Sequence, residues 1–169
     1  MRLDHIAYRV SDKEKAAQFF IDSMNYKIED EFKIEFDDGT CANCYAMSHP
    51  DKGSNFHIDQ TGSKRYKWSY INFDYNGTST YHIPPEIFVS EGTKGSIVDK
   101  WVSDRSGVGG IHHLAYQVHD VEYTMNEWKT KDWAEFTTEK PIKAKGLVQC
   151  FTKPHPITGI IYEFINREE

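Results

Sequence analysis

The sequence predicts an α+β protein made of two tandem βαβββ modules. The first observation is an internal repeat: residues 4–20, DHIAYRVSDKEKAAQFF, align with residues 112–128, HHLAYQVHDVEYTMNEW, at an offset of 108 residues throughout. The second observation is that each copy begins with the period-two alternation of a strand, continues with helical spacing and is followed by strand-like segments. Because both copies show the same order of patterns, we expect the chain to fold as two versions of one unit.

The opening strand of each module carries a histidine among apolar residues. Period-two alternation places His5 on the same face as Ala7, and the second copy repeats this arrangement with His113 and Ala115. The opposite faces carry apolar residues: Ile6, Tyr8 and Val10 in the first copy, and Leu114, Tyr116 and Val118 in the second. By the same alternation, we expect His112 to face away from His113, behind the site or at the surface.

A helix is expected after each opening strand. The first would begin at Ser11, with Glu14 three residues further on, which is the pattern of a capping box. Ala16, Phe20 and Met24 follow helical spacing and would face the sheet. The corresponding residues of the second helix are Val121, Met125 and Trp128.

Further strands are expected after each helix. The segments are KIEFDD, CANCYAM and PEIFVS in the first half, and GLVQCFT and GIIYEFI in the second. The last strand of each half contains a glutamate among apolar residues, Glu86 in the first and Glu163 in the second. We therefore expect these two acids, like the two histidines, to occupy corresponding places.

The two modules differ in length, which sets the expected domain boundaries. The first module covers residues 1–92 and contains an insertion at about 48–82, whose many Gly, Ser, Thr, Asn and Tyr residues suit a long ordered loop or an added hairpin. Residues 93–110 are expected to form a linker helix and a glycine-rich turn. The second module covers residues 111–169.

Composition and charge exclude several classes of protein. A net charge of -6 and a pI near 5.7 argue against a nucleic-acid-binding surface, and no apolar run reaches the length of a membrane span. Cys41, Cys44 and Cys150 are too few for a disulfide scaffold, and the N-terminus has no secretory signal pattern. We expect a cytoplasmic protein that binds a small molecule rather than nucleic acid or a membrane.

The duplicated histidines and glutamates indicate a metal site with His5, Glu86, His113 and Glu163 as ligands. Taken singly, a strand histidine is more often a core residue with satisfied hydrogen bonds, and a strand glutamate usually faces solvent. Their duplication favours convergence of imidazole nitrogens and carboxylate oxygens, because charged groups on apolar strands are costly unless they are paired or metal-bound. Such a donor set suits a divalent ion: Zn, Ni, Co, Mn or Fe(II).

These segments resemble the vicinal-oxygen-chelate superfamily, which includes glyoxalases, bleomycin-resistance proteins, methylmalonyl-CoA epimerases, extradiol dioxygenases and 4-hydroxyphenylpyruvate dioxygenases. The similarity is carried by LDHIAYRV, SIVDKWVSDRSGVGGIHHLAYQVHDVE and FTKPHPITGIIYEFI. It implies a curved half-open barrel around a divalent metal, with His5, His113 and Glu163 at ligand positions and Glu86 near the fourth. It also implies a homodimer.

The epimerase branch is the most similar, and it implies an isomerase or lyase of the glyoxalase and epimerase type. The metal would stabilise the enediolate formed next to a carbonyl of an oxo acid or acyl thioester, and Glu163 or Glu86 would carry the proton. In the epimerases the base is a carboxylate on a first-module strand. The matching strand here, CANCYAM, contains no acid, although Asp37 and Asp38 lie just upstream.

Two other functions stay open from the sequence. The segment LVQCFTKP resembles the second module of 4-hydroxyphenylpyruvate dioxygenase, which implies an Fe(II)-dependent dioxygenase that uses His5, His113 and Glu163 as ligands. The other is a protein of the bleomycin-resistance type, which binds a small molecule without catalysis.

Overall fold

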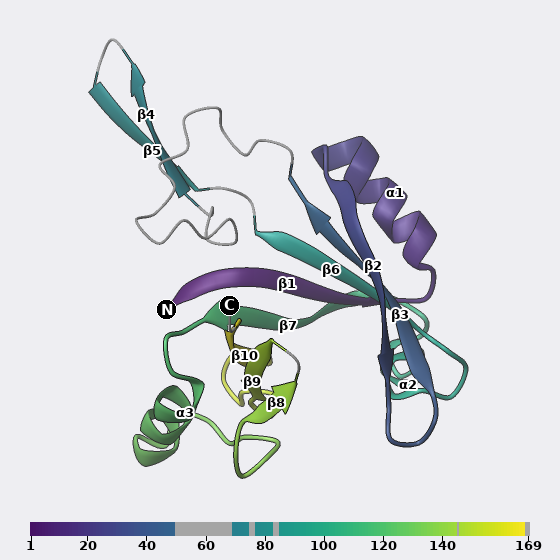
Figure 1. Ribbon diagram of the computed structural model, residues 1–169. Coiled ribbons are helices and arrows are strands. Elements are labelled where there is room, and N and C mark those ends of the chain that lie inside the picture. Colours follow the sequence, from purple (N-terminus) through teal and green to yellow (C-terminus); the bar gives the residue numbers. More distant parts are fainter. Residues whose placement is uncertain (50–68, 75–76, 83–84, 145, 168–169) are drawn as a thin grey trace.

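The first module contains the predicted order of one strand, one helix and further strands. The computed structural model describes residues 1–49, 69–74, 77–82, 85–144 and 146–167. The elements of the first module are β1 (Arg2–Val10), α1 (Lys13–Met24), β2 (Lys27–Glu35), β3 (Cys41–Ser48) and β6 (Glu86–Gly92). Its strands lie in the order β2-β3-β6-β1, and β1 is parallel to β6 (Figure 1).

The second module repeats this arrangement with shorter strands. Its elements are β7 (Gly110–Gln117), α3 (Val121–Thr130), β8 (Ile142–Ala144), β9 (Leu147–Phe151) and β10 (Ile161–Asn166). Its strands lie in the order β7-β10-β9-β8, and β7 is parallel to β10. The sequence therefore revealed four of these elements, and the three-residue strand β8 completes the βαβββ unit.

The two modules join into one sheet of eight strands through their first strands, β1 and β7, which pair antiparallel at its centre. The sheet curls into an open half-barrel, with α1 beside the strands of the first module and α3 beside those of the second (Figure 1). This confirms the predicted α+β fold class and the curved barrel that the resemblance implied.

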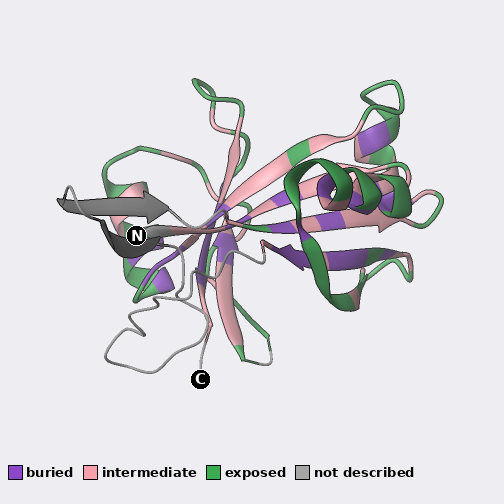
Figure 2. Ribbon diagram, turned by 90° about the horizontal axis from the view of Figure 1, so that it is seen from above, coloured by how far each residue is buried: buried purple, intermediate pink, exposed green. Residues whose placement is uncertain are grey.

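The core is divided between the modules. One cluster of buried apolar residues lies between α1 and the first four strands and includes Phe20, Met47 and Val89. A second cluster lies between α3 and the second four strands and includes Met125 and Phe164. Buried segments alternate mainly with partly exposed ones along the strands, and the outer sides of the helices are exposed (Figure 2). On the face opposite α1, a third cluster packs Ala42 and Cys44 against Val98 of the linker helix. The rest of that face remains for a site.

A two-stranded hairpin and a short helix lie outside the paired modules. Strands β4 (Ser69–Asp74) and β5 (Gly77–His82) form an antiparallel hairpin with its own two-stranded sheet, inside the insertion expected at 48–82. Residues 50–68 of that insertion lie outside the described residues. Helix α2 (Ile97–Ser103) lies in the expected linker, with Val98 and Val102 buried. None of the helices described is long and apolar enough to cross a membrane.

The start of α1 differs from the predicted capping box. Asp12, not Ser11, is the N-cap, and its side chain accepts a hydrogen bond from the backbone N–H of Lys15. Glu14 does not reach back to the cap, because its Oε1 accepts a hydrogen bond from the Tyr45 hydroxyl at 2.7 Å. The helix therefore begins one residue later than expected.

The buried face of α1 is displaced as a result. Its buried residues are Lys13, Ala17 and Phe20. The prediction for Phe20 is confirmed and Ala16 is partly buried, but Met24, expected to face the sheet, is 46% exposed. In α3 the predicted face is confirmed, since Val121 and Met125 are buried and Trp128 packs against the same cluster.

Strand β2 also differs from its prediction, because it ends at Glu35 instead of continuing through KIEFDD. Residues 36–40 form a turn, in which the Phe36 N–H donates to the Thr40 carbonyl and the Gly39 N–H donates to the Phe36 carbonyl. Gly39 has a φ of 78° in this turn. Asp37 and Asp38 lie exposed in this turn, and Asp38 accepts hydrogen bonds from Thr40. Neither acid therefore lies on a strand of the sheet.

The junction of β6 with α2 leaves no space for a side chain at Gly92. A Cβ at this position would lie 2.2 Å from Ser96 Oγ and 2.6 Å from Asp99 N, the two atoms that form the α2 N-cap. We predict that Gly92→Ala lowers the free energy of unfolding by about 1–3 kcal/mol. Gly110→Ala is the control, because its nearest contact is a Trp101 ring atom at 3.7 Å. Urea denaturation measures both variants, and equal stabilities would contradict the prediction.

Candidate metal centre

The predicted ligands lie along the seam between β1 and β7. His5 and Glu163 are both paired with Ala115, His5 from the β1 side and Glu163 from the β10 side. Ala115 is fully buried, and its small side chain leaves room for the two longer ones to approach each other above it. His113 lies two residues before Ala115 on β7 and on the same face. Three strands thus bring His5, His113 and Glu163 to one point.

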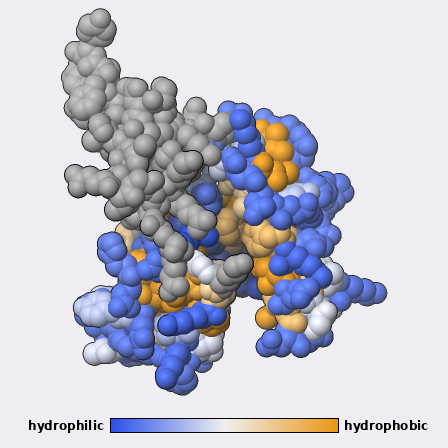
Figure 3. Space-filling view, viewed as in Figure 1, coloured by the Kyte–Doolittle hydropathy of each residue, from blue (hydrophilic) through white to orange (hydrophobic). Residues whose placement is uncertain are grey.

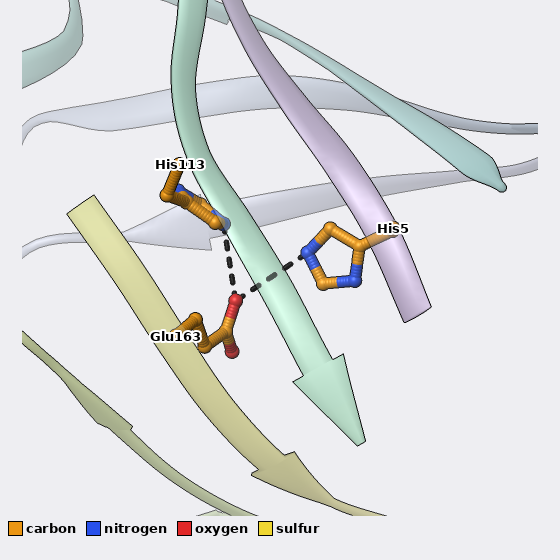
Figure 4. A group of neighbouring side chains, drawn as sticks. All are labelled: His5, His113 and Glu163. Atoms are coloured by element: carbon orange, nitrogen blue, oxygen red, sulfur yellow. Dashed lines mark ion pairs between the residues drawn. The ribbon is translucent and has the colours of Figure 1, made fainter. Parts of the chain in front are cut away.

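The ligand atoms of these three residues converge. Glu163 Oε2 lies 3.4 Å from His5 Nε2 and 3.0 Å from His113 Nε2, so both rings point at the same carboxylate oxygen (Figure 4). Among the described residues, His5, His113 and Glu163 form the group whose ligand atoms all lie within 4.8 Å of one another. His5 and Glu163 are each 2% exposed. The structure therefore brings together three of the four predicted ligands.

The distances fit a first-row divalent ion. Two ligand atoms that are each about 2.1 Å from an ion are about 3.0 Å apart at an octahedral angle and about 3.4 Å apart at a tetrahedral angle. The two measured nitrogen–oxygen distances, 3.0 and 3.4 Å, lie in this range. Two imidazoles and a carboxylate are ligands that Zn, Ni, Co, Mn and Fe(II) accept. His5, His113 and Glu163 are thus suited to hold such an ion.

Glu86 occupies a different place from the one expected. It is paired with His5, whereas in the second module the partner of His113 is Ile161 and Glu163 lies opposite Ala115. The two glutamates are therefore two residues out of register, and the expectation that they occupy corresponding places is wrong. Glu86 is exposed and lies outside the group of three, so its assignment as a fourth ligand stays a prediction.

Phe88 stands at the first-module place that corresponds to Glu163. It pairs with Ala7, the repeat equivalent of Ala115, and its ring stacks on the His5 ring with centroids 4.0 Å apart and an interplanar angle of 13°. Phe151 contacts the His113 ring edge-on at 5.4 Å. Apolar residues also line part of the hollow between the two halves (Figure 3). Aromatic walls therefore hold both imidazole rings in place.

The protonation of the three residues follows from burial and from their mutual contacts. Burial raises the pKa of Glu163, but hydrogen bonds from His113 and His5 outweigh it and bring the pKa to about 2. Burial lowers the pKa of His5, but its hydrogen bonds to Asp4 and Glu163 prevail and raise it to about 9. Burial keeps the pKa of His113 below its ordinary value. Without a metal, His5 is cationic at neutral pH and balances Glu163.

Sequence reasoning missed Asp4 and Arg167 behind the centre and gave His112 the wrong orientation. Asp4 Oδ2 accepts hydrogen bonds from His5 Nδ1 and from Arg167 Nη2, both at 2.8 Å. His112 does not face away from His113, because their Nδ1 atoms lie 2.8 Å apart. Burial, reinforced by the positive charge of Arg9, lowers the pKa of His112 to about 3, so this residue is neutral. The motifs Asp-His and His-His contained a signal for the first two contacts, but no pattern indicated Arg167.

The cysteines are not part of the centre. All three are free thiols, and Cys44 and Cys150 are buried. Cys44 Sγ lies 3.2 Å from the Ser90 hydroxyl, and burial raises the pKa of Cys150 to about 12. A thiol must lose its proton to bind a metal or act as a nucleophile. Cys44 and Cys150 are therefore core residues, and burial raises the pKa of both thiols.

Comparison with known proteins defines the family of this chain. Residues 4–151 match the sequence profile of the Glyoxalase/Bleomycin resistance protein/Dioxygenase superfamily. Because this match covers most of the chain, the protein belongs to that superfamily. A search of curated protein sequences finds no match.

Solved structures of similar fold include epimerases. A methylmalonyl-CoA epimerase has a TM-score of 0.66 at 16% identity, with 100% of this chain and 97% of that chain covered. A hypothetical protein from Bacillus halodurans has a TM-score of 0.66 at 19% identity, with 99% and 95% covered. The methylmalonyl-CoA epimerase from Mycobacterium tuberculosis has a TM-score of 0.65 at 17% identity, with 99% and 89% covered. At these identities the likeness establishes the fold.

The pKa of His5 predicts how metal binding depends on pH. An ion at Nε2 must displace the proton that His5 holds up to pH of about 9. The affinity for Zn²⁺ or Co²⁺ should therefore rise about tenfold per pH unit between about pH 7 and 8, because Glu163 is ionised there and burial holds the pKa of His113 below its ordinary value. Chelator-competition titrations measure the slope, and calorimetry in buffers of different ionisation enthalpy counts the released proton.

His155→Gln is the control for this measurement. His155 bonds the backbone carbonyl of Trp133 and lies outside the ligand group, so its replacement should leave the slope unchanged. An affinity that is independent of pH in the unaltered protein would contradict the protonation assigned to His5.

Proposed function

We propose that the protein is a divalent-metal-dependent enzyme of the glyoxalase and epimerase type, which moves a proton next to a carbonyl of a small oxo acid or acyl thioester. The observation that carries this proposal is the convergence of His5, His113 and Glu163 on one point of the concave face. A divalent ion held there would polarise a carbonyl oxygen and stabilise the negative charge that forms when the adjacent proton leaves. The similarity in fold to methylmalonyl-CoA epimerases supports this class of reaction.

The residue best placed to carry the proton is Glu86. Glu163 is poorly suited, because it is buried, contacts two histidines and has a pKa of about 2. Glu86 is exposed and is the strand partner of His5, so its side chain leaves the sheet on the same face as the ligand. A general base must reach the substrate, and an exposed carboxylate beside the centre meets this condition.

The first-module wall carries no acid on β3. Of the β3 residues on the face of the centre, Ala46 is small and partly exposed, whereas Ala42 and Cys44 are buried against Val98 of α2. Asp37 and Asp38 lie in the turn beyond this strand. A similar structure is methylmalonyl-CoA epimerase in complex with methylmalonyl-CoA and NH4+. We infer that an acyl thioester or oxo acid binds against this wall and that Glu86, on β6, removes its proton.

A second candidate is an Fe(II)-dependent dioxygenase. Two histidines and one carboxylate with other coordination positions open form the facial triad of such enzymes, and the group of three has this composition. Oxygen consumption by the Fe(II)-loaded protein with a series of 2-oxo acids distinguishes this activity from proton transfer, which consumes no oxygen.

We predict that Glu163→Gln and Glu86→Gln have different effects. Glu163→Gln removes a charged ligand and should abolish both tight zinc binding and turnover. Glu86→Gln should retain zinc affinity within about threefold but lower turnover by about 100-fold to 10,000-fold, as expected for a lost general base. Turnover is measured by NMR as solvent-deuterium exchange of methylmalonyl-CoA, of the hemithioacetal of glutathione and methylglyoxal, and of 2-oxo acids.

Glu122→Gln, on the exposed first turn of α3, is the matched control and should leave both quantities unchanged. Circular dichroism and thermal unfolding confirm that each variant is folded. Normal exchange by Glu163→Gln would refute the metal-dependent mechanism, and normal exchange by Glu86→Gln would refute the role of Glu86 alone.

A further inference from the structure

Each metal-binding histidine is directly preceded by a β-bulge. The register between β1 and β7 shifts twice: Asp4 is the extra residue on β1 before His5, and His112 is the extra residue on β7 before His113. The two bulged residues are 108 positions apart, which is the offset of the internal repeat. The bulge is therefore duplicated together with the ligand that follows it.

The bulges explain how neighbouring side chains meet. In a regular strand consecutive side chains point to opposite faces, but an extra residue breaks this alternation. Asp4 can thus bond the Nδ1 of His5 at 2.8 Å, and His112 can bond the Nδ1 of His113 at 2.8 Å. In both modules the bond leaves Nε2 directed at Glu163.

We propose, building on the metal centre of the proposed function, that Asp4 and His112 are positioning residues that hold the two imidazoles with Nε2 toward the ion. A hydrogen bond at Nδ1 sets both the orientation and the tautomer of a ligating histidine. The two residues act differently, because Asp4 is a carboxylate and only accepts, whereas a neutral imidazole nitrogen can donate or accept. Asp4 therefore accepts the Nδ1 proton of His5, whereas His112 can either donate to Nδ1 of His113 or accept from it.

The surroundings of Asp4 make it the firmer support. Arg167 Nη2 donates to the same Oδ2 that His5 bonds, at 2.8 Å. Arg167 follows β10, the strand that carries Glu163, so this ion pair ties the end of β10 to the bulge of β1. A charged hydrogen bond of this kind is stronger than one between neutral groups. The first-module histidine is therefore the anchored ligand of the centre.

The surroundings of His112 hold its ring in place. Its ring meets the Trp101 ring edge-on at 5.6 Å, and the guanidinium of Arg105 lies 3.7 Å above the same indole. With an ion held at Nε2 of His113, the Nδ1 of that ring would carry its proton and His112 Nδ1 would accept from it. Without the ion, His113 Nε2 would donate to Glu163, and His112 Nδ1 would be the donor. Each ring thus carries its one proton on a different nitrogen in the two states, and the pair keeps two protons and no net charge.

The test combines zinc affinity with NMR of the imidazole protons. Asp4→Ala should raise the zinc dissociation constant about 10- to 100-fold, and His112→Phe should raise it by a smaller factor of about 10. Asp4→Asn retains an oxygen that accepts from His5 Nδ1, so it should recover part of the loss. Asp37→Ala and His119→Phe, at exposed positions, are the controls and should bind zinc normally.

Nitrogen-15 NMR of the histidines separates positioning from stability. In unaltered protein the proton on His5 Nδ1 and the proton shared by His112 and His113 should exchange slowly with water, with or without zinc. Asp4→Ala should lose the first protected proton only, and His112→Phe the second only. Variants that bind zinc within threefold of the unaltered protein, or unaltered protein without these protected protons, would overturn the proposal.

The same measurements distinguish this inference from the proposed function. If the unaltered protein binds zinc but exchanges no substrate proton, the function fails while the affinities of the variants still decide the positioning roles. If it binds no zinc, the metal centre fails, and the protected protons of the metal-free protein alone confirm or refute the hydrogen bonds. A greater loss of affinity in His112→Phe than in Asp4→Ala would overturn the assignment of His5 as the anchored ligand.

Discussion

The antiparallel pairing of β1 with β7 is the interaction on which the rest of the structure depends. Each of these strands is also paired in parallel with the last strand of its own module, so all three converging ligands lie on the seam or one strand away from it. A slip of one residue at the seam would place the two histidines on opposite faces of the sheet. The two bulges stand on this seam, which means that register and ligand orientation are set by the same backbone pairing.

The symmetry of the duplication is retained in the strands and lost in the carboxylates. β6 pairs with β1 so that Phe88, not an acid, stands where the second module has Glu163. The centre therefore contains one buried carboxylate between two imidazoles rather than two carboxylates facing each other. A pair of buried acids would require a second compensating charge. With a single one between the imidazoles, the charge on His5 offsets that of Glu163, while Arg167 offsets that of Asp4.

The sequence predicted the parts that depend on local pattern. The repeat, the two helices and the faces of His5 and His113 follow from spacing along the chain, and these residues lie where expected. The register between strands could not be predicted, because pairing partners are far apart in sequence; Glu86 was therefore placed in equivalence with Glu163. Bulges also escape prediction, since strict alternation turned His112 away from His113. The start of α1 was displaced because Ser11 and Asp12 are both good cap residues.

The arrangement of ligands limits what the site can do. All three come from β1, β7 and β10, so a bound ion is held from the sheet side, and its remaining positions face the open concave side. Four-coordinate geometry leaves one such position and octahedral geometry leaves three, enough for a substrate that offers two oxygens. Phe88 and Phe151 limit the space beside the histidines, and α2 closes the far end of the first module by packing Val98 on Ala42 and Cys44. Among the described residues, the exposed carboxylate whose strand position lies directly beside His5 is Glu86, which places it next to the open positions of a bound ion.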